Sequence, residues 1–138
     1  MNWWFLAAGS LSLVTAAVHM LLGGPEIHLP VQASEDLSRE VRAVMAVVWH
    51  GVSAILSLSG AATIYAACTG KLKSTVVFIA AQHAALAALF IGYGFVRFGS
   101  LLVIPQWTLF FVIVVLTGLG LRPWSRNPGA GTDPAAIP

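Results

Sequence analysis

The sequence has 138 residues, of which 58% are hydrophobic and 9% are charged. Soluble domains carry about 25% charged residues, so this composition cannot cover a water-exposed surface and is typical of membrane-spanning helices. The formal net charge of +2, without a basic cluster, argues against nucleic acid as a partner, and the single cysteine, Cys68, excludes an intramolecular disulfide or a cysteine-rich zinc site.

Four apolar runs dominate the chain and predict an all-α integral membrane protein. A helix of about twenty residues, rising 1.5 Å per residue, crosses the ~30 Å hydrocarbon core of a bilayer. Trp3 and Trp4 begin the first run, where indole rings favour the headgroup zone. Gly23-Gly24-Pro25 ends this run, because proline cannot continue a helix. The predicted spans are residues 3–22, 43–67, 75–96 and 101–121.

The connections between these spans set the expected topology. Only residues 25–42 form a long connection, in which Ser34, followed by Glu35 and Asp36, predicts the start of an interfacial helix over residues 34–42. The other connections are a few residues long, which makes consecutive spans antiparallel neighbours. This predicts an up-down-up-down four-helix bundle over residues 1–126. The segment 127–138, rich in Gly, Pro and Ala, is expected to be a disordered tail.

Each of the first three predicted spans carries a stripe of small residues, and each stripe contains a histidine. Membrane helices pack through small residues, because lipid provides no hydrophobic force between helices. His19, His50 and His83 are therefore expected to face the bundle interior. The stripes consist of Ala8, Ser12, Thr15 and His19; of Ala46, His50, Ser53, Ser57 and Gly60; and of Ala80, His83, Ala87 and Gly94.

The depth of each histidine decides which of them could share a site. At 1.5 Å per residue, His19 lies about 6 Å and His50 about 10–12 Å from the outer ends of their spans, whereas His83 lies about 20 Å from its outer end. His19 and His50 could thus bind one ligand, with Glu26 and His28 of the long connection beside them. The candidate ligand-binding residues are His19, Glu26, His28, His50 and His83, and the candidate metal ligands are His19 and His50.

Several chemistries remain open for these histidines. Neutral histidines can simply form hydrogen bonds between helices. A haem b would need a histidine on each face at matching depth, which the unequal depths do not favour. Copper would suit histidine together with Met20 and Met45. A histidine could also act as a general base toward a lipid-like substrate, with Glu26 as its partner.

The segments Val18-His19, Gly23-Gly24-Pro25-Glu26-Ile27 and Val48-Trp49-His50 resemble those of a group of small four-span bacterial inner-membrane proteins without an assigned activity. The likeness covers the first two spans and their connection, and it implies a four-helix inner-membrane fold. In size and layout the chain is also similar to DoxX-like proteins and to the membrane-associated eicosanoid and glutathione enzymes. It lacks the arginine-rich signature of the latter, and it lacks the histidine set of two-haem b-type cytochromes.

Two functions of different class fit the sequence. The favoured interpretation is a non-enzymatic accessory or scaffold protein with structural interior histidines, which would contact the lipid bilayer and a membrane-protein partner or a second copy. The alternative is a ligand-, haem- or metal-binding protein, or an enzyme, whose histidine site opens to the outer leaflet. His50 lies deepest among the polar groups of the outer half, so its substitution is expected to be the most damaging among the four histidines.

The positions of lysine and arginine predict that both termini lie in the cytoplasm, because positive residues beside membrane spans accumulate on the inner side. One side of the predicted bundle carries Lys71, Lys73, Arg122 and Arg126, and the other carries Arg39, Arg42 and Arg97. A fluorescent protein fused after Pro138 is therefore expected to fluoresce, and an alkaline phosphatase fused there is expected to be inactive. Phosphatase activity at Pro138 would reverse the assignment.

Overall fold

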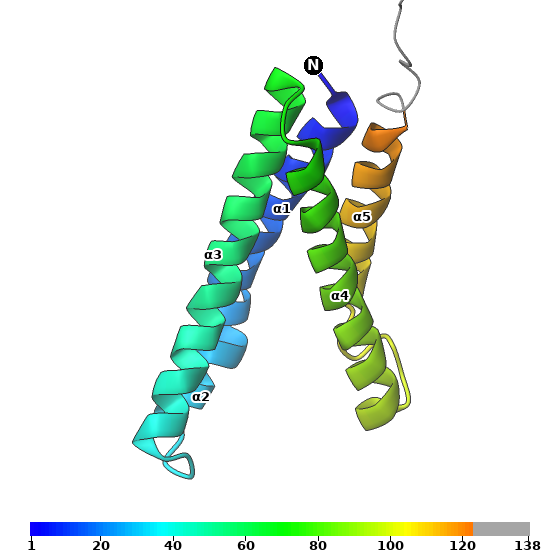
Figure 1. Ribbon diagram of the computed structural model, residues 1–138. Coiled ribbons are helices and arrows are strands. Elements are labelled where there is room, and N and C mark those ends of the chain that lie inside the picture. The colour runs from blue at the N-terminus through cyan, green and yellow to red at the C-terminus, as the bar shows by residue number, and fades with distance from the viewer. Residues whose placement is uncertain (123–138) are drawn as a thin grey trace, which may run out of the picture.

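The computed structural model describes residues 1–122, and within them the chain is helical, with short connections. Its helices confirm the predicted all-α class and the up-down-up-down order (Figure 1). Arg126 and the predicted tail over residues 127–138 lie outside the described residues. The elements are α1 (Trp3–Leu21), the π-helix η1 (Gly24–His28), α2 (Leu29–Ala33), α3 (Arg39–Thr69), α4 (Lys73–Phe98) and α5 (Trp107–Leu121).

Three helical stretches are long and apolar enough to cross a membrane. They are Trp3–Ala33, in which α1, η1 and α2 follow one another, Arg39–Thr69 and Lys73–Phe98. Helix α5 has 15 residues, which corresponds to about 22 Å and is shorter than a bilayer core. The predicted fourth span, residues 101–121, is therefore wrong at its start: residues 100–106 are not helical. Pro105 explains this difference, because proline lacks a backbone N–H and biases the residue before it away from helix.

The connection predicted as a loop over residues 25–42 is largely helical. The helix does not end at Gly23, because η1 continues it through a π-turn in which the N–H of Leu29 donates to the carbonyl of Gly24. Pro25 fits at the start of this turn, where a backbone N–H is not needed. The first membrane helix thus extends well beyond the predicted end at residue 22.

Helix α3 begins at Arg39 and not at Ser34, so the predicted interfacial helix over residues 34–42 is wrong in its first half. Ser38 takes the N-cap position, because its hydroxyl accepts a hydrogen bond from the N–H of Val41 at 3.3 Å. The guanidinium of Arg42 donates to the carbonyls of Ser34 and Leu37. These bonds hold residues 34–38 as a non-helical connection between α2 and α3.

The helices form two pairs, α1 with α3 and α4 with α5, which meet at one end and diverge toward the other (Figure 1). Asn2 links the helices at the joined end. Its backbone N–H donates to the carbonyl of Ala67 in α3 at 2.9 Å, and its side-chain amide donates to the carbonyl of Gly120 in α5 at 2.8 Å. The ring of Phe5 is fully buried beside Gly120, where any Cβ atom would collide with it. The joined end is therefore closely packed.

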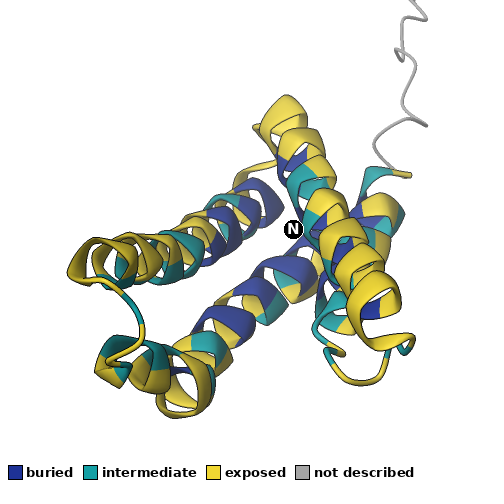
Figure 2. Cartoon of the chain, turned by 90° about the horizontal axis from the view of Figure 1, so that it is seen from below, coloured by how far each residue is buried: buried dark blue, intermediate teal, exposed yellow. Residues whose placement is uncertain are grey.

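Two small clusters of buried side chains connect the pairs. Viewed from below, the buried residues face one another and the exposed residues face outward (Figure 2). In the most apolar stretch of α3 only 6% of the residues are buried, so most of its surface is left for lipid or a partner. One cluster contains Phe5, Ala66, Ala67 and Val76, and the other contains Ala16, Leu56, Ala87 and Phe110.

The predicted small-residue faces are confirmed on α1 and α4 but wrong on α3. Ser12 and Thr15 are buried on α1, and His83 and Ala87 are buried on α4. Of the residues predicted to form the buried face of α3, only Gly60 is buried. The predicted members His50 and Ser57 are exposed, whereas the buried residues are Leu56, Ser59, Gly60, Thr63, Ala66 and Ala67.

Gly9 of α1 and Gly60 of α3 mark the closest approach of these two helices. A Cβ atom on Gly60 would lie 2.8 Å from the carbonyl oxygen of Gly9, and a Cβ atom on Gly9 would lie 2.7 Å from that of Gly60. Backbone oxygens cannot move aside as a flexible side chain can. Glycine at both positions therefore lets the backbones approach, as is common between membrane helices.

We predict that Gly60→Ala lowers the thermal stability of the full chain in detergent, by roughly 1–3 kcal/mol, because the added methyl group would force α1 and α3 apart. Gly51→Ala on the same helix is the matched control, since its Cβ atom would meet only open space in the described part of the chain. The control should be neutral or slightly stabilising, because alanine favours helix over glycine. Equal unfolding temperatures for the two variants would contradict the importance of this crossing.

Candidate functional site

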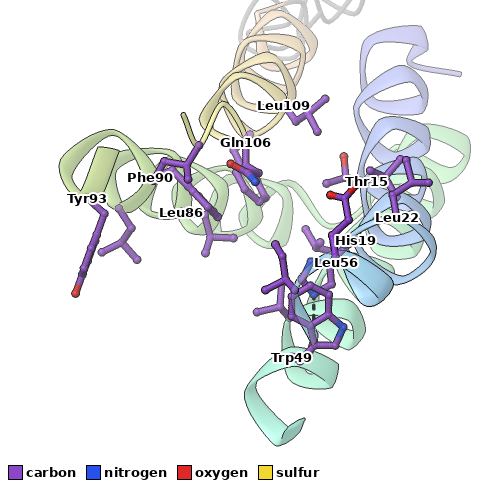
Figure 3. A pocket seen from close by; sticks show the side chains of 18 residues that line it. Thr15, His19, Leu22, Trp49, Leu56, Leu86, Phe90, Tyr93, Gln106 and Leu109 are labelled. Atoms are coloured by element: carbon purple, nitrogen blue, oxygen red, sulfur yellow. Dashed lines mark hydrogen bonds between the residues drawn. The ribbon is translucent and has the colours of Figure 1, made fainter. Parts of the chain in front are cut away.

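The two helix pairs enclose a cleft of about 630 Å³ toward their diverging ends (Figure 3). This volume lies in the range of pockets that bind small molecules. One wall comes from α1, η1 and α3, and the other comes from α4, α5 and the connection between them. Aliphatic and aromatic side chains form most of both walls, among them Val18, Leu22, Val52, Leu56, Leu86, Leu89, Phe90 and Leu109.

His19, Trp49 and His28 form an aromatic stack beside the cleft. The ring centroids of His19 and Trp49 lie 3.8 Å apart at an interplanar angle of 21°, and those of His28 and Trp49 lie 5.4 Å apart at 19°. Nε2 of His19 also donates to the backbone carbonyl of Trp49 at 3.3 Å. The indole lies over Gly23, where a Cβ atom would be 3.0 Å from the ring. Trp49 is therefore held firmly in the wall of the cleft.

The π-turn of η1 explains how His28 reaches this stack. In a regular α-helix the nine residues from His19 to His28 turn the chain by about 900° around the helix axis. This is two full turns and a half, so the two rings would lie on opposite sides of the helix. A π-turn accommodates one extra residue without advancing the helix by a further step. The angle between the two side chains around the helix axis therefore falls to about 80°, and both histidines can face α3. The local break in helical geometry therefore assembles the stack from two positions that a straight helix would separate.

The structure brings His19, His28 and His50 into one cluster, but not in the predicted arrangement. The rings of His28 and His50 meet edge to face, with centroids 5.2 Å apart. His50 is exposed, so the prediction that it faces the interior is wrong. It lies outside the cleft, whereas His19 and Glu26 line it and Glu26 is exposed. His19, His28 and His50 are thus neighbours, and of the five predicted site residues only His19 and Glu26 line the cleft.

His83 lies apart from this cluster and is fully buried, as predicted. Its Nδ1–H donates to the carbonyl of Ile79 at 2.8 Å, and its Nε2 lies 3.4 Å from the hydroxyl oxygen of Ser12 in α1. That hydroxyl in turn donates to the carbonyl of Leu56 in α3 at 2.9 Å. His83 and Ser12 therefore join three helices through polar contacts, which is the role expected of a structural interior histidine.

The described residues do not bring together a complete set of metal ligands. Among residues 1–122, no group of three or more His, Cys, Asp or Glu side chains is arranged to hold a metal ion. His19 and His50, the predicted metal pair, contact different rings of the cluster. Met20 accepts a hydrogen bond from Ser53 at 2.9 Å, and Met45 is exposed. Haem and copper therefore remain hypotheses.

Two residues that line the cleft, Trp49 and Gln106, are not among the site residues predicted from the sequence. Trp49 forms the centre of the aromatic stack. Gln106 lines the cleft, and its Oε1 atom is buried without a hydrogen-bond partner among residues 1–122. A lone amide within an apolar run is itself a signal, because polar groups in membrane segments are costly and often functional.

No family model, curated protein or solved structure matches this chain. The resemblance to four-span inner-membrane proteins and to DoxX-like proteins therefore stays a prediction.

From the sequence, substitution of His50 is expected to be the most damaging among the histidines. Because His83 is buried and His50 is exposed, we now expect substitution of His83 to be more damaging than that of His50. We predict that His83→Ala lowers stability by roughly 2 kcal/mol or more, because it leaves a cavity and removes an interhelical contact. His50→Ala should change stability by less than about 0.5 kcal/mol, as is usual for exposed positions. Thermal unfolding of both variants in the same detergent measures the difference. A larger loss for His50→Ala would restore the order expected from the sequence.

Proposed function

We propose that this protein binds a lipid-like molecule in the cleft between its two helix pairs. The observation that supports this most directly is the cleft itself, which is large enough for a small molecule and has mostly apolar walls. A molecule with a long apolar chain could enter it from the bilayer without crossing water. This corresponds to the second of the two functions considered from the sequence, a membrane-embedded ligand-binding protein, and it leaves open whether the ligand is also a substrate.

The accessory or scaffold function has support from a different observation. His83 fits the structural role that this hypothesis assigns to interior histidines, and the outward face of α3 is free to contact a membrane-protein partner or a second copy. However, a scaffold does not require an apolar cleft with a fixed aromatic wall. We therefore favour ligand binding and treat a scaffold role as the competing outcome of the experiment below.

We further propose that the chain lies in the cell inner membrane with both termini in the cytoplasm. Asn2 and Gly120 are hydrogen-bonded, so the N-terminal end of α1 and the C-terminal end of α5 lie together at the joined end. With both termini in the cytoplasm, as the positive residues suggest, the joined end would be cytoplasmic. The diverging end, with the histidine cluster and the mouth of the cleft, would then lie in the outer leaflet.

We predict that a long-chain alkyl diazirine labels residues of the cleft in a saturable manner when the full chain is held in nanodiscs and illuminated. Leu89→Trp should reduce this labelling at least roughly fivefold, because Leu89 lines the cleft and is exposed, so the larger ring fills space without disturbing a packed core. Peptide mapping by mass spectrometry identifies the labelled residues.

Leu58→Trp is the matched control, since Leu58 is exposed on α3 outside the cleft. It should leave labelling of the cleft unchanged. Labelling that rises linearly with probe, or that is equally reduced by both substitutions, would argue for ordinary lipid contact and favour the scaffold function.

A further inference from the structure

Glu26 brings a carboxylate into the lining of the cleft. It belongs to η1, within the stretch Trp3–Ala33 that is long and apolar enough to cross a membrane. Its side chain is exposed, so a molecule that occupies the cleft can reach it. Acidic residues in such stretches are costly and usually face a cavity, where they mark the path of an ion or a substrate. A bound molecule therefore meets a negative charge in this cleft.

The described chain supplies no positive partner for this carboxylate. Among residues 1–122, the side chain of Glu26 takes part in no hydrogen bond or ion pair. No lysine or arginine of the described chain lines the cleft. Arg42, at the same end of the molecule, donates instead to the carbonyls of Ser34 and Leu37. The charge of Glu26 is thus left to be balanced by water, by an ion from solution or by a bound molecule.

Three other polar side chains of the cleft do not balance this charge. The hydroxyl of Thr15 donates to the carbonyl of Leu11 at 2.8 Å, and Nε2 of His19 donates to the carbonyl of Trp49 at 3.3 Å. The Oε1 atom of Gln106 is buried, which puts it out of reach of a molecule in the cleft. None of these groups carries a charge when histidine is neutral.

The indole N–H of Trp49 and the hydroxyl of Tyr93 are the remaining donors of the lining, and they lie on opposite walls (Figure 3). Neither group has a hydrogen-bond partner among residues 1–122. Trp49 is half-buried and Tyr93 is exposed, so water or the ester groups of lipids can bind both without a specific ligand. They do not favour an anionic head group, because Glu26 in the same cleft would repel it.

The apolar walls strengthen the effect of Glu26 on a charged head group. Charges interact more strongly where the effective dielectric constant is low. An anionic head would be repelled and would find no cation in the described lining. An uncharged head would leave the carboxylate without a partner. Only a cationic head gains an ion pair. Because Glu26 is exposed, this gain is a modest one.

Resting on the proposed function, we infer that the ligand is a cationic amphiphile, with an ammonium head beside Glu26 and an alkyl chain along the apolar walls. Glu26 lies eleven residues beyond Thr15, so about 15 Å of helix separates the head group from the inner part of the cleft. This distance leaves room for a long alkyl chain. The chain supplies contact area, and the carboxylate selects the charge of the head group.

The test uses the full chain in nanodiscs of zwitterionic lipid at pH 8, where an ordinary imidazole is neutral. The alkyl diazirine is the probe, and three competitors share one chain: dodecyltrimethylammonium, dodecanol and dodecyl sulfate. At equal mole fraction in the bilayer, the ammonium should displace the probe at a roughly three- to tenfold lower concentration than dodecanol. Dodecyl sulfate should be the weakest competitor.

Glu26→Gln removes the charge and keeps the size of the side chain. It should abolish the preference for the ammonium over dodecanol, while saturable labelling and displacement by dodecanol stay unchanged and show that the cleft is intact. Glu26→Lys should reverse the order, so that dodecyl sulfate competes best. Glu35→Gln is the matched control, because Glu35 is exposed in the connection between α2 and α3 and does not line the cleft. It should keep the preference for the ammonium.

The possible failures distinguish this inference from the proposed function. Equal competition by the ammonium and dodecanol in the unaltered protein would overturn the cationic ligand and leave the cleft as a lipid site. A preference that survives Glu26→Gln, or that Glu35→Gln removes equally, would do the same. If none of the competitors displaces the probe and labelling does not saturate, the proposed function fails, and this inference fails with it.

Discussion

The contacts of Asn2 and Phe5 at the joined end are the interactions on which the remaining structure depends. Asn2 caps α1 with its side-chain oxygen, donates its amide to Gly120 and donates its backbone N–H to Ala67. Phe5 packs against Gly120 in the same region. These contacts join three helices at this end of the molecule. The helix pairs are free to diverge from there, and a cleft results where a uniformly packed bundle would have none.

Such a cleft is physically reasonable in a bilayer, because lipid chains can cover apolar walls that water could not. Its inner limit is set by the packed layer of Leu56 and Phe110, beside which His83 and Ser12 join the helices through polar contacts. Its wall is made rigid by Trp49, which rests on Gly23 and stacks with two histidines. The histidines of the cluster therefore shape the wall of the cleft.

Much of the fold could be predicted from the sequence, because the bilayer imposes simple rules on composition and length. Apolar runs longer than about twenty residues predicted the helices, and the short connections predicted their antiparallel order. Gly70 and Gly99 end α3 and α4 in left-handed conformations, as glycine allows. The ends of the helices near Pro25 and Ser34 could not be predicted from the sequence. They depend on the π-turn of η1 and on the hydrogen bonds from Arg42 to the connection between α2 and α3.

The sequence by itself determined that the chain spans a membrane and that it is helical. It also determined the buried faces of α1 and α4 and the proximity of His19, His28 and His50. Only the tertiary structure decided which face of α3 is buried, because two stripes of small residues on that helix share Gly60 and sequence periodicity cannot choose between them. The crossing with Gly9 selects the stripe that turns His50 outward. The cleft itself also belongs to tertiary structure, since the divergence of two helix pairs depends on contacts between residues far apart in the chain.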